Sequence, residues 1–152
     1  MQDAAEQLRI GGDEIAIHVT SEATGGSLLA AQVRIPAGGG PPALHRHEAE
    51  EIYRLERGEL TVYLADADGE VRRIPSGAGT VVHIPGGRSH TVRNESGDEA
   101  VAFVVFSPGA QMERFVRAAG ELAAGGPPRG EDVASLAERH GIEFTGALPA
   151  QR

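Results

Sequence analysis

Two short segments place histidine, glutamate, glycine and proline at fixed intervals, and they constrain this chain more than any other feature. The first reads G-x5-H-x-H-x3-E-x6-G and covers residues 39–58. The second reads G-x5-P-x-G-x2-H-x3-N and covers residues 79–94. Because alternate side chains of a β-strand project from one face, His45 and His47 can direct both imidazoles toward one point. The glycines and the proline between these positions are suited to tight turns.

The first three quarters of the chain read as short strands separated by turns that are rich in glycine and proline. After Pro108 the apolar positions recur every three to four residues, which predicts helices at 112–122 and 132–140. Many short strands at regular spacing indicate a β-sandwich or a barrel. The expected strands are residues 14–20, 27–35, 51–55, 59–64, 70–74, 79–84, 89–94 and 99–107.

The composition excludes several kinds of site and partner. The 152 residues include no cysteine, so disulfides and thiolate metal ligands are excluded. The net charge is −8, from 14 basic and 22 acidic residues, and the arginines are scattered along the chain. Nucleic acids and anionic membranes both need a basic face, so neither partner is expected. The N-terminus lacks a signal-peptide pattern and no apolar run is long enough to span a bilayer, so a cytoplasmic location is expected.

In this order, and with every specified position filled, the two segments resemble the signature motifs of the cupin superfamily. The resemblance implies an all-β jelly-roll barrel of two antiparallel sheets at residues 1–109, with a short helical extension at 110–152 in the same domain. It also implies a homodimer and four metal ligands, which are His45, His47, Glu51 and His90. Three imidazoles, one carboxylate and no thiolate suit one divalent transition ion among iron, nickel, manganese, cobalt, copper and zinc.

Further side chains close to the motifs are candidates for a pocket that binds a small-molecule substrate. By resemblance to quercetinases, Glu51 is expected to be both a metal ligand and the base that takes a proton from a substrate hydroxyl. Tyr53 shares the strand parity of Glu51, and it either lines the pocket as a catalytic residue or packs in the barrel. His83 is either a pocket acid or base or a surface residue. Gln32 and Arg34 share a face that points either outward or toward the substrate.

A narrower resemblance bears on the reaction. Residues 51–60, the strand exit at 107–109 and the tail at 140–144 resemble small bacterial cupins of the quercetin 2,3-dioxygenase-like group. This resemblance implies a metal-dependent dioxygenase that acts on a small hydroxylated aromatic or enol substrate. Two alternatives stay open. One is a zinc-type cyclase or isomerase in which His83 or Tyr53 moves the proton, and the other is a non-catalytic protein that binds a small molecule.

Overall fold

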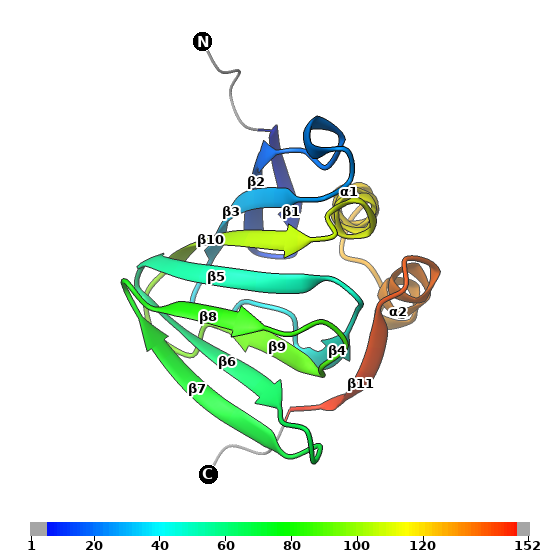
Figure 1. Cartoon of the computed structure of the whole chain (residues 1–152). Helices are drawn as coiled ribbons and strands as arrows, with labels where there is room; N and C mark the ends of the chain where they lie inside the picture. Colours follow the sequence, from blue (N-terminus) through cyan, green and yellow to red (C-terminus); the bar gives the residue numbers. More distant parts are fainter. Residues whose placement is uncertain (1–5, 149–152) are drawn as a thin grey trace.

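Two antiparallel β-sheets enclose the core in the computed structural model, which describes residues 6–148 (Figure 1). The larger sheet has the strand order β1-β2-β3-β10-β5-β8, and the smaller has the order β11-β4-β9-β6-β7. This arrangement confirms the expected all-β jelly-roll class. The strands are β1 (Glu6–Ile10), β2 (Asp13–Val19), β3 (Leu29–Ile35), β4 (Ala43–Arg46), β5 (Glu50–Arg57), β6 (Glu59–Ala65), β7 (Val71–Gly77), β8 (Val81–Ile84), β9 (His90–Arg93), β10 (Ala100–Ser107) and β11 (Glu143–Ala147). The helices are the 3-10 helix η1 (Glu22–Thr24), α1 (Ala110–Ala124) and α2 (Gly130–Arg139).

Strand pairing brings the two motif segments to the same end of the barrel. In the smaller sheet, His45 of β4 is the antiparallel partner of His90 of β9. In the larger sheet, Glu51 of β5 is the partner of Phe106 of β10. Because the two sheets face each other, side chains on the inner faces at these positions point into a shared interior.

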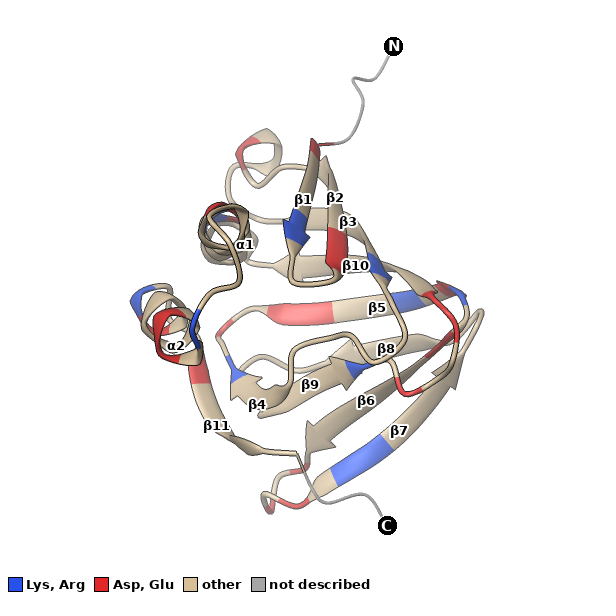
Figure 2. Cartoon of the chain, turned by 180° about the vertical axis from the view of Figure 1, so that it is seen from behind, with Lys and Arg blue, Asp and Glu red and all other residues tan. Residues whose placement is uncertain are grey.

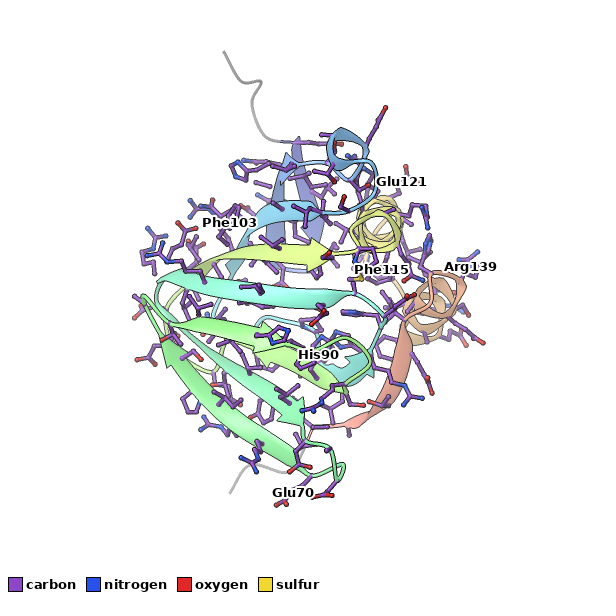
Figure 3. The ribbon with its side chains drawn as sticks, in the orientation of Figure 1. Glu70, His90, Phe103, Phe115, Glu121 and Arg139 are labelled. Carbon is purple, nitrogen blue, oxygen red and sulfur yellow. The ribbon has the colours of Figure 1, made fainter. Side chains whose placement is uncertain are left out.

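The core lies between the sheets and takes alternate side chains from each strand. In β10 the inward set includes Ala102, Val104 and Phe106, which belong to the main hydrophobic cluster. Phe103 lies on the opposite face, outside the larger sheet (Figure 3). Both faces of this strand are apolar, so its sequence alone does not identify the inner one. Burying each large apolar side chain stabilises the fold by about 1.5–3 kcal/mol.

The motif glycines and Asn94 occupy turns that hold the strand ends together. Gly58 and Gly87 have φ angles of +79° and +82°, which side chains other than glycine rarely adopt. At Gly58 a Cβ would also lie 2.7 Å from the carbonyl oxygen of Glu99. Asn94 is buried, and its Nδ2 donates to the carbonyl oxygens of Ile35 and Asp98, both at 2.8 Å. Its backbone N–H donates to the carbonyl of Gly39 at 3.0 Å, which ties the end of the second motif to the start of the first.

The C-terminal extension contains the two expected helices and a strand that was not expected. The buried faces of α1 and α2 include Met112 and Ala137, which both belong to the main core cluster. After α2 the chain forms β11, which pairs with β4 and becomes the edge of the smaller sheet. The sequence predicted a barrel at residues 1–109 and a helical extension at 110–152. Residues 1–5 of the first range and 149–152 of the second lie outside the described residues.

Charged side chains form mainly separate surface pairs. Figure 2 shows the basic positions of the described chain as short separate segments on several elements. Arg34 and Arg57 both contact Glu99, and Arg46 contacts Glu143. Such exposed pairs contribute about 0–1 kcal/mol each. Within residues 6–148, no helix has the length and the apolar character needed to cross a membrane.

Candidate metal centre

Three histidines converge inside the barrel. His45 lies in β4, His47 follows the end of that strand, and His90 begins β9. Each offers one ring nitrogen, and these three atoms lie within 4.8 Å of one another. The ring of His90 is centred 4.6 Å from that of His45 and 4.9 Å from that of His47. Figure 3 shows His90 in the interior between the two sheets.

The backbone fixes which ring nitrogen of each histidine faces the centre. Nδ1 of His45 donates to the carbonyl of Ala43 at 3.1 Å, and Nδ1 of His47 donates to that of Ala49 at 3.0 Å. Nδ1 of His90 donates to the carbonyl of Arg88, two residues earlier in the chain, at 2.8 Å. A carbonyl oxygen only accepts, so each Nδ1 donates and carries a proton, and the Nε2 side of each ring faces the centre. An imidazole that is oriented by a hydrogen bond from its outer nitrogen to a backbone carbonyl is typical of histidine metal ligands.

Glu51 brings a carboxylate to the same point. Its Oε1 lies 2.6 Å from Nε2 of His47 and 3.1 Å from Nε2 of His90. The approach to His47 lacks hydrogen-bond geometry, and within residues 6–148 Nε2 of His47 is a buried polar atom without a hydrogen-bond partner. A buried acceptor without a donor is costly unless a cation satisfies it. Three imidazole nitrogens and one carboxylate oxygen therefore fit a divalent transition ion.

Burial and the neighbouring charges set the pKa of each group in this cluster. Burial, reinforced by the adjacent His90, lowers the pKa of His45 to about 4, so this ring stays neutral. Burial alone would raise the pKa of Glu51, but His47 and His90 outweigh it and hold that pKa well below its ordinary value. Burial would lower the pKa of His90, but the Glu51 carboxylate outweighs it and raises that pKa. The cluster thus keeps Glu51 ionised and His45 neutral, and the carboxylate favours a proton on His90 that a metal ion would have to displace.

Two aromatic side chains, Phe106 and Tyr53, lie beside the cluster. The ring of Phe106 lies 6.5 Å from that of His47. Tyr53 lines a cavity of about 10 Å³ together with apolar side chains and the hydroxyl residues Ser76 and Thr80, a volume that holds roughly one water molecule. Burial and the adjacent Glu51 carboxylate raise the pKa of the Tyr53 hydroxyl, so it stays protonated. The structure therefore brings Tyr53 to the interior next to the metal cluster.

Of the two positions left open for His83, in the pocket as an acid or base or at the surface, the structure shows the surface position, so its assignment as a candidate catalytic residue is corrected. Its side chain is 55% exposed, and its Nε2 lies 2.8 Å from Oε1 of Glu50. The cause is strand parity. Ile84, one residue along β8, is fully buried in the core, so His83 faces outward, opposite the exposed Ile52 of β5. The proton-transfer role considered for His83 therefore has no geometric support.

Gln32 and Arg34 also face outward. Nε2 of Gln32 donates to Glu56 at 3.3 Å, and Arg34 donates to Glu99 at 3.0 Å. Their neighbours on β3, which include Val33, fill the core instead. Neither side chain is therefore placed to orient a substrate beside the histidines.

Two aromatic residues near the cluster were not identified from the sequence. Phe106 packs beside His47, and Phe144 of β11 is the antiparallel partner of His45. Both faces of β10 are apolar, so the sequence did not show that Phe106 points inward. Nothing in the local sequence indicated that Phe144 belongs to a strand beside β4, because that pairing joins distant parts of the chain.

Comparison with known proteins decides the family. Residues 31–106 match the sequence model of the family described as "Cupin domain", a match that covers half of the chain and includes all four candidate ligands. The chain belongs to the cupin family. The match begins within β3 and ends within β10, so this cupin carries β1, β2, both α-helices and β11 outside the matched stretch.

Individual relatives agree with this assignment. The cupin is 31% identical over 75 residues to auxin-binding protein 1 of Arabidopsis thaliana, a match that covers 47% of this chain and 38% of the relative. A recombinant oxalate oxidase solved in complex with glycolate is 25% identical, with a TM-score of 0.55 over 66% of this chain and 53% of that one. A predicted oxalate decarboxylase from Thermotoga maritima is 25% identical, with a TM-score of 0.57 over 68% of this chain and 91% of that one. This cupin thus spans well under half of auxin-binding protein 1 and about half of the oxalate oxidase.

Proposed function

We propose that this cupin is a metal-dependent dioxygenase whose substrate is a small molecule that binds metal through deprotonated oxygen, such as an enol or a small hydroxylated carboxylate. The observation that carries the proposal is the set of three imidazole nitrogens and one carboxylate oxygen that meet at one point. Nitrogen and oxygen donors of this kind, with positions left for substrate, suit redox-active ions such as iron, manganese, cobalt and nickel.

The metal and the residues divide the chemistry between them. A bound divalent ion supplies a Lewis acid for the substrate oxygen and a path for electrons toward dioxygen. His45, His47 and His90 hold it in a fixed orientation because their Nδ1 atoms are tied to the backbone. Glu51 would accept the proton of the substrate hydroxyl at its carboxylate. Its pKa is held low, so the transfer requires a hydroxyl that the bound ion has made acidic. Tyr53 stays protonated beside it as a donor. Both atoms of dioxygen enter the products and the substrate supplies all the electrons, so no further reductant is required.

A small substrate is favoured at this centre. Phe106 is buried beside His47, with ring centres 6.5 Å apart, so a bulky apolar side chain occupies space next to the cluster. Two solved relatives at 25% identity are described as an oxalate oxidase bound to glycolate and a predicted oxalate decarboxylase, and these descriptions support a small oxygen-donor substrate here.

Metal content and oxygen consumption test this proposal together. Protein purified without chelators is measured by mass spectrometry of its metal, then stripped and reloaded with iron, manganese, cobalt, nickel or zinc in turn. Each form is screened in an oxygen electrode with oxalate, glycolate, small enols and a flavonol. We expect one redox-active ion per chain and oxygen uptake with at least one small substrate. His47→Ala serves as the site variant, and His83→Ala, which changes an outward histidine, is the matched control.

Specific outcomes would contradict the proposal. Stoichiometric metal without oxygen uptake on any substrate would refute the dioxygenase and leave zinc-type proton transfer or simple ligand binding. A flavonol turned over faster than the small substrates would contradict the size argument. Equal metal content in wild type and His47→Ala would show that the cluster is not the metal site.

A further inference from the structure

We propose that Phe144 gates the approach to the metal cluster and sets the width of the ligand that reaches it. The inference rests on the proposed metal centre, and it concerns a residue outside the stretch matched to the cupin family, which ends at residue 106. Phe144 belongs to β11, which the chain forms only after both C-terminal α-helices.

The first step is that access to the cluster is uneven. The side chains of His47, Glu51 and His90 are at most 3% exposed. His45 is half-buried, so it is the ligand candidate that solvent reaches most easily. A small molecule that replaces water at this centre therefore approaches past His45.

The second step is that Phe144 stands beside this route. It is the direct antiparallel partner of His45, so both side chains project from the same face of the smaller sheet. Directly paired residues have Cβ atoms about 4.5–5.5 Å apart, which is within the reach of a phenyl ring. Phe144 is 40% exposed, one of the large apolar side chains that the described part of the chain leaves at the surface. An exposed phenyl ring beside the accessible ligand is placed to narrow the entrance.

The third step is that β11 is anchored at its N-terminal end but packs little along its length. Before it, Ile142 is buried, and its N–H donates to the carbonyl of Ala137 at 2.9 Å. On the strand itself, Arg46 donates two hydrogen bonds to Glu143 at 2.9 and 2.8 Å. Every residue of β11 is exposed, and its register with β4 breaks between Phe144 and Gly146. A strand with few buried contacts can open locally at small cost while its anchors stay in place.

The experiment follows cobalt uptake and ligand binding, so it needs no knowledge of the substrate. Apo protein is mixed with Co²⁺, and the visible absorption of the bound ion reports the rate of uptake. Phe144→Ala widens the entrance and Phe144→Trp narrows it. Thr145→Ala changes the neighbouring exposed residue of the same strand, at the break in register, and is the matched control. We expect uptake to be about fivefold faster in Phe144→Ala, slower in Phe144→Trp and unchanged in Thr145→Ala, because a modest change in a barrier alters a rate by roughly this factor.

Ligand selectivity gives the second readout. Oxalate and a two-ring aromatic carboxylate, naphthoate, are titrated into the Co²⁺ protein, and the shift of the same absorption gives each Kd. We expect Phe144→Ala to lower the Kd of naphthoate about tenfold relative to that of oxalate. Relief of one steric clash of modest size changes a Kd by that order.

The outcomes separate the gate from the metal site. Faster uptake in both Phe144→Ala and Phe144→Trp would show that Phe144 merely holds β11 in place, and it would overturn the gate. Equal uptake rates and equal Kd ratios in wild type, Phe144→Ala and Phe144→Trp would overturn the gate as well. Failure of the wild-type protein to take up Co²⁺ would overturn the metal centre, and the gate with it. Far-UV circular dichroism of each variant confirms that the barrel is folded.

Discussion

Replacing the buried amide of Asn94 by a carboxyl group should destabilise the barrel strongly and in a pH-dependent way. Asn94 is 1% exposed, and its Nδ2 donates to two backbone carbonyls, those of Ile35 and Asp98. In Asn94→Asp an ionised carboxylate can donate neither bond. The carbonyl of Asp98 belongs to an exposed residue and keeps the Ser96 hydroxyl as a donor, so only the carbonyl of Ile35 is left buried without one. A buried acceptor without a donor costs about 1–3 kcal/mol, which is the loss expected at pH 7.

The sign of the pH dependence follows from the same contacts. Burial and the facing carbonyl oxygens disfavour the charged form, so the pKa of the introduced carboxyl rises in the folded state above its ordinary value of about 3.9. A raised folded-state pKa means that protonation favours the folded variant. The deficit relative to wild type should therefore be largest above that folded pKa and shrink as the pH falls toward about 4.

Urea unfolding of the apo protein, followed by circular dichroism at pH 7, 6, 5 and 4, measures this difference directly. Ser96→Ala is the control, because the Ser96 hydroxyl lies at the rim of the same turn, where it donates to Oδ1 of Asn94 or to the carbonyl of Asp98 and accepts from the N–H of Asp98. It should cost about 1 kcal/mol or less at every pH. A deficit for Asn94→Asp below about 1 kcal/mol at pH 7, or one that stays constant between pH 7 and 4, would refute this account of the turn.

Four further predictions concern the metal centre, the barrel and its assembly. His47→Ala should bind no metal by mass spectrometry while its apo form keeps the far-UV circular dichroism of wild type; loss of all folded signal would instead make the metal structural. Because the pKa of His90 is raised above the ordinary value of about 6.5 and that of His45 is about 4, protons should compete with Co²⁺ first at His90. Calorimetric affinity should therefore begin to fall above about pH 6.5 and continue to fall below it; affinity unchanged down to about pH 5 would contradict histidine ligation. Glu113 accepts the N–H of Ser21 at 2.6 Å, and this contact and Arg117 hold its pKa below the ordinary value despite burial, so Glu113→Gln should lose about 1–2 kcal/mol at pH 7 and little near pH 3, as urea titrations would reveal. The expected homodimer stays a prediction that light scattering can check against the chain mass of 15.9 kDa.

The spacing of the motifs was enough to predict the fold class and the meeting of His45, His47 and His90. The reason is physical. The H-x-H pattern places two imidazoles on one face, and the turn glycines and Asn94 define the register that sets His90 against His45. Such residues are locally constrained, so their pattern is visible in the chain.

The features that escaped prediction depend on contacts between distant segments. In β8 the residues around His83 are all apolar, so alternation did not reveal that this side chain points outward. Strand β11 is wholly exposed and contains Gly146, and it forms because β4 offers a free edge nearly a hundred residues earlier in the chain. Tertiary pairing of this kind overrides weak local preference.

The hydrogen bonds of the three Nδ1 atoms have a consequence for how such a barrel can evolve. Each ring is oriented by a carbonyl two residues away in its own segment, so no other side chain is needed to aim it. Neighbouring residues on the barrel wall can then be exchanged during evolution without turning the rings. The main chain thereby fixes the orientation of the ion-holding rings, while the side chains of the interior are free to diverge toward new reactions.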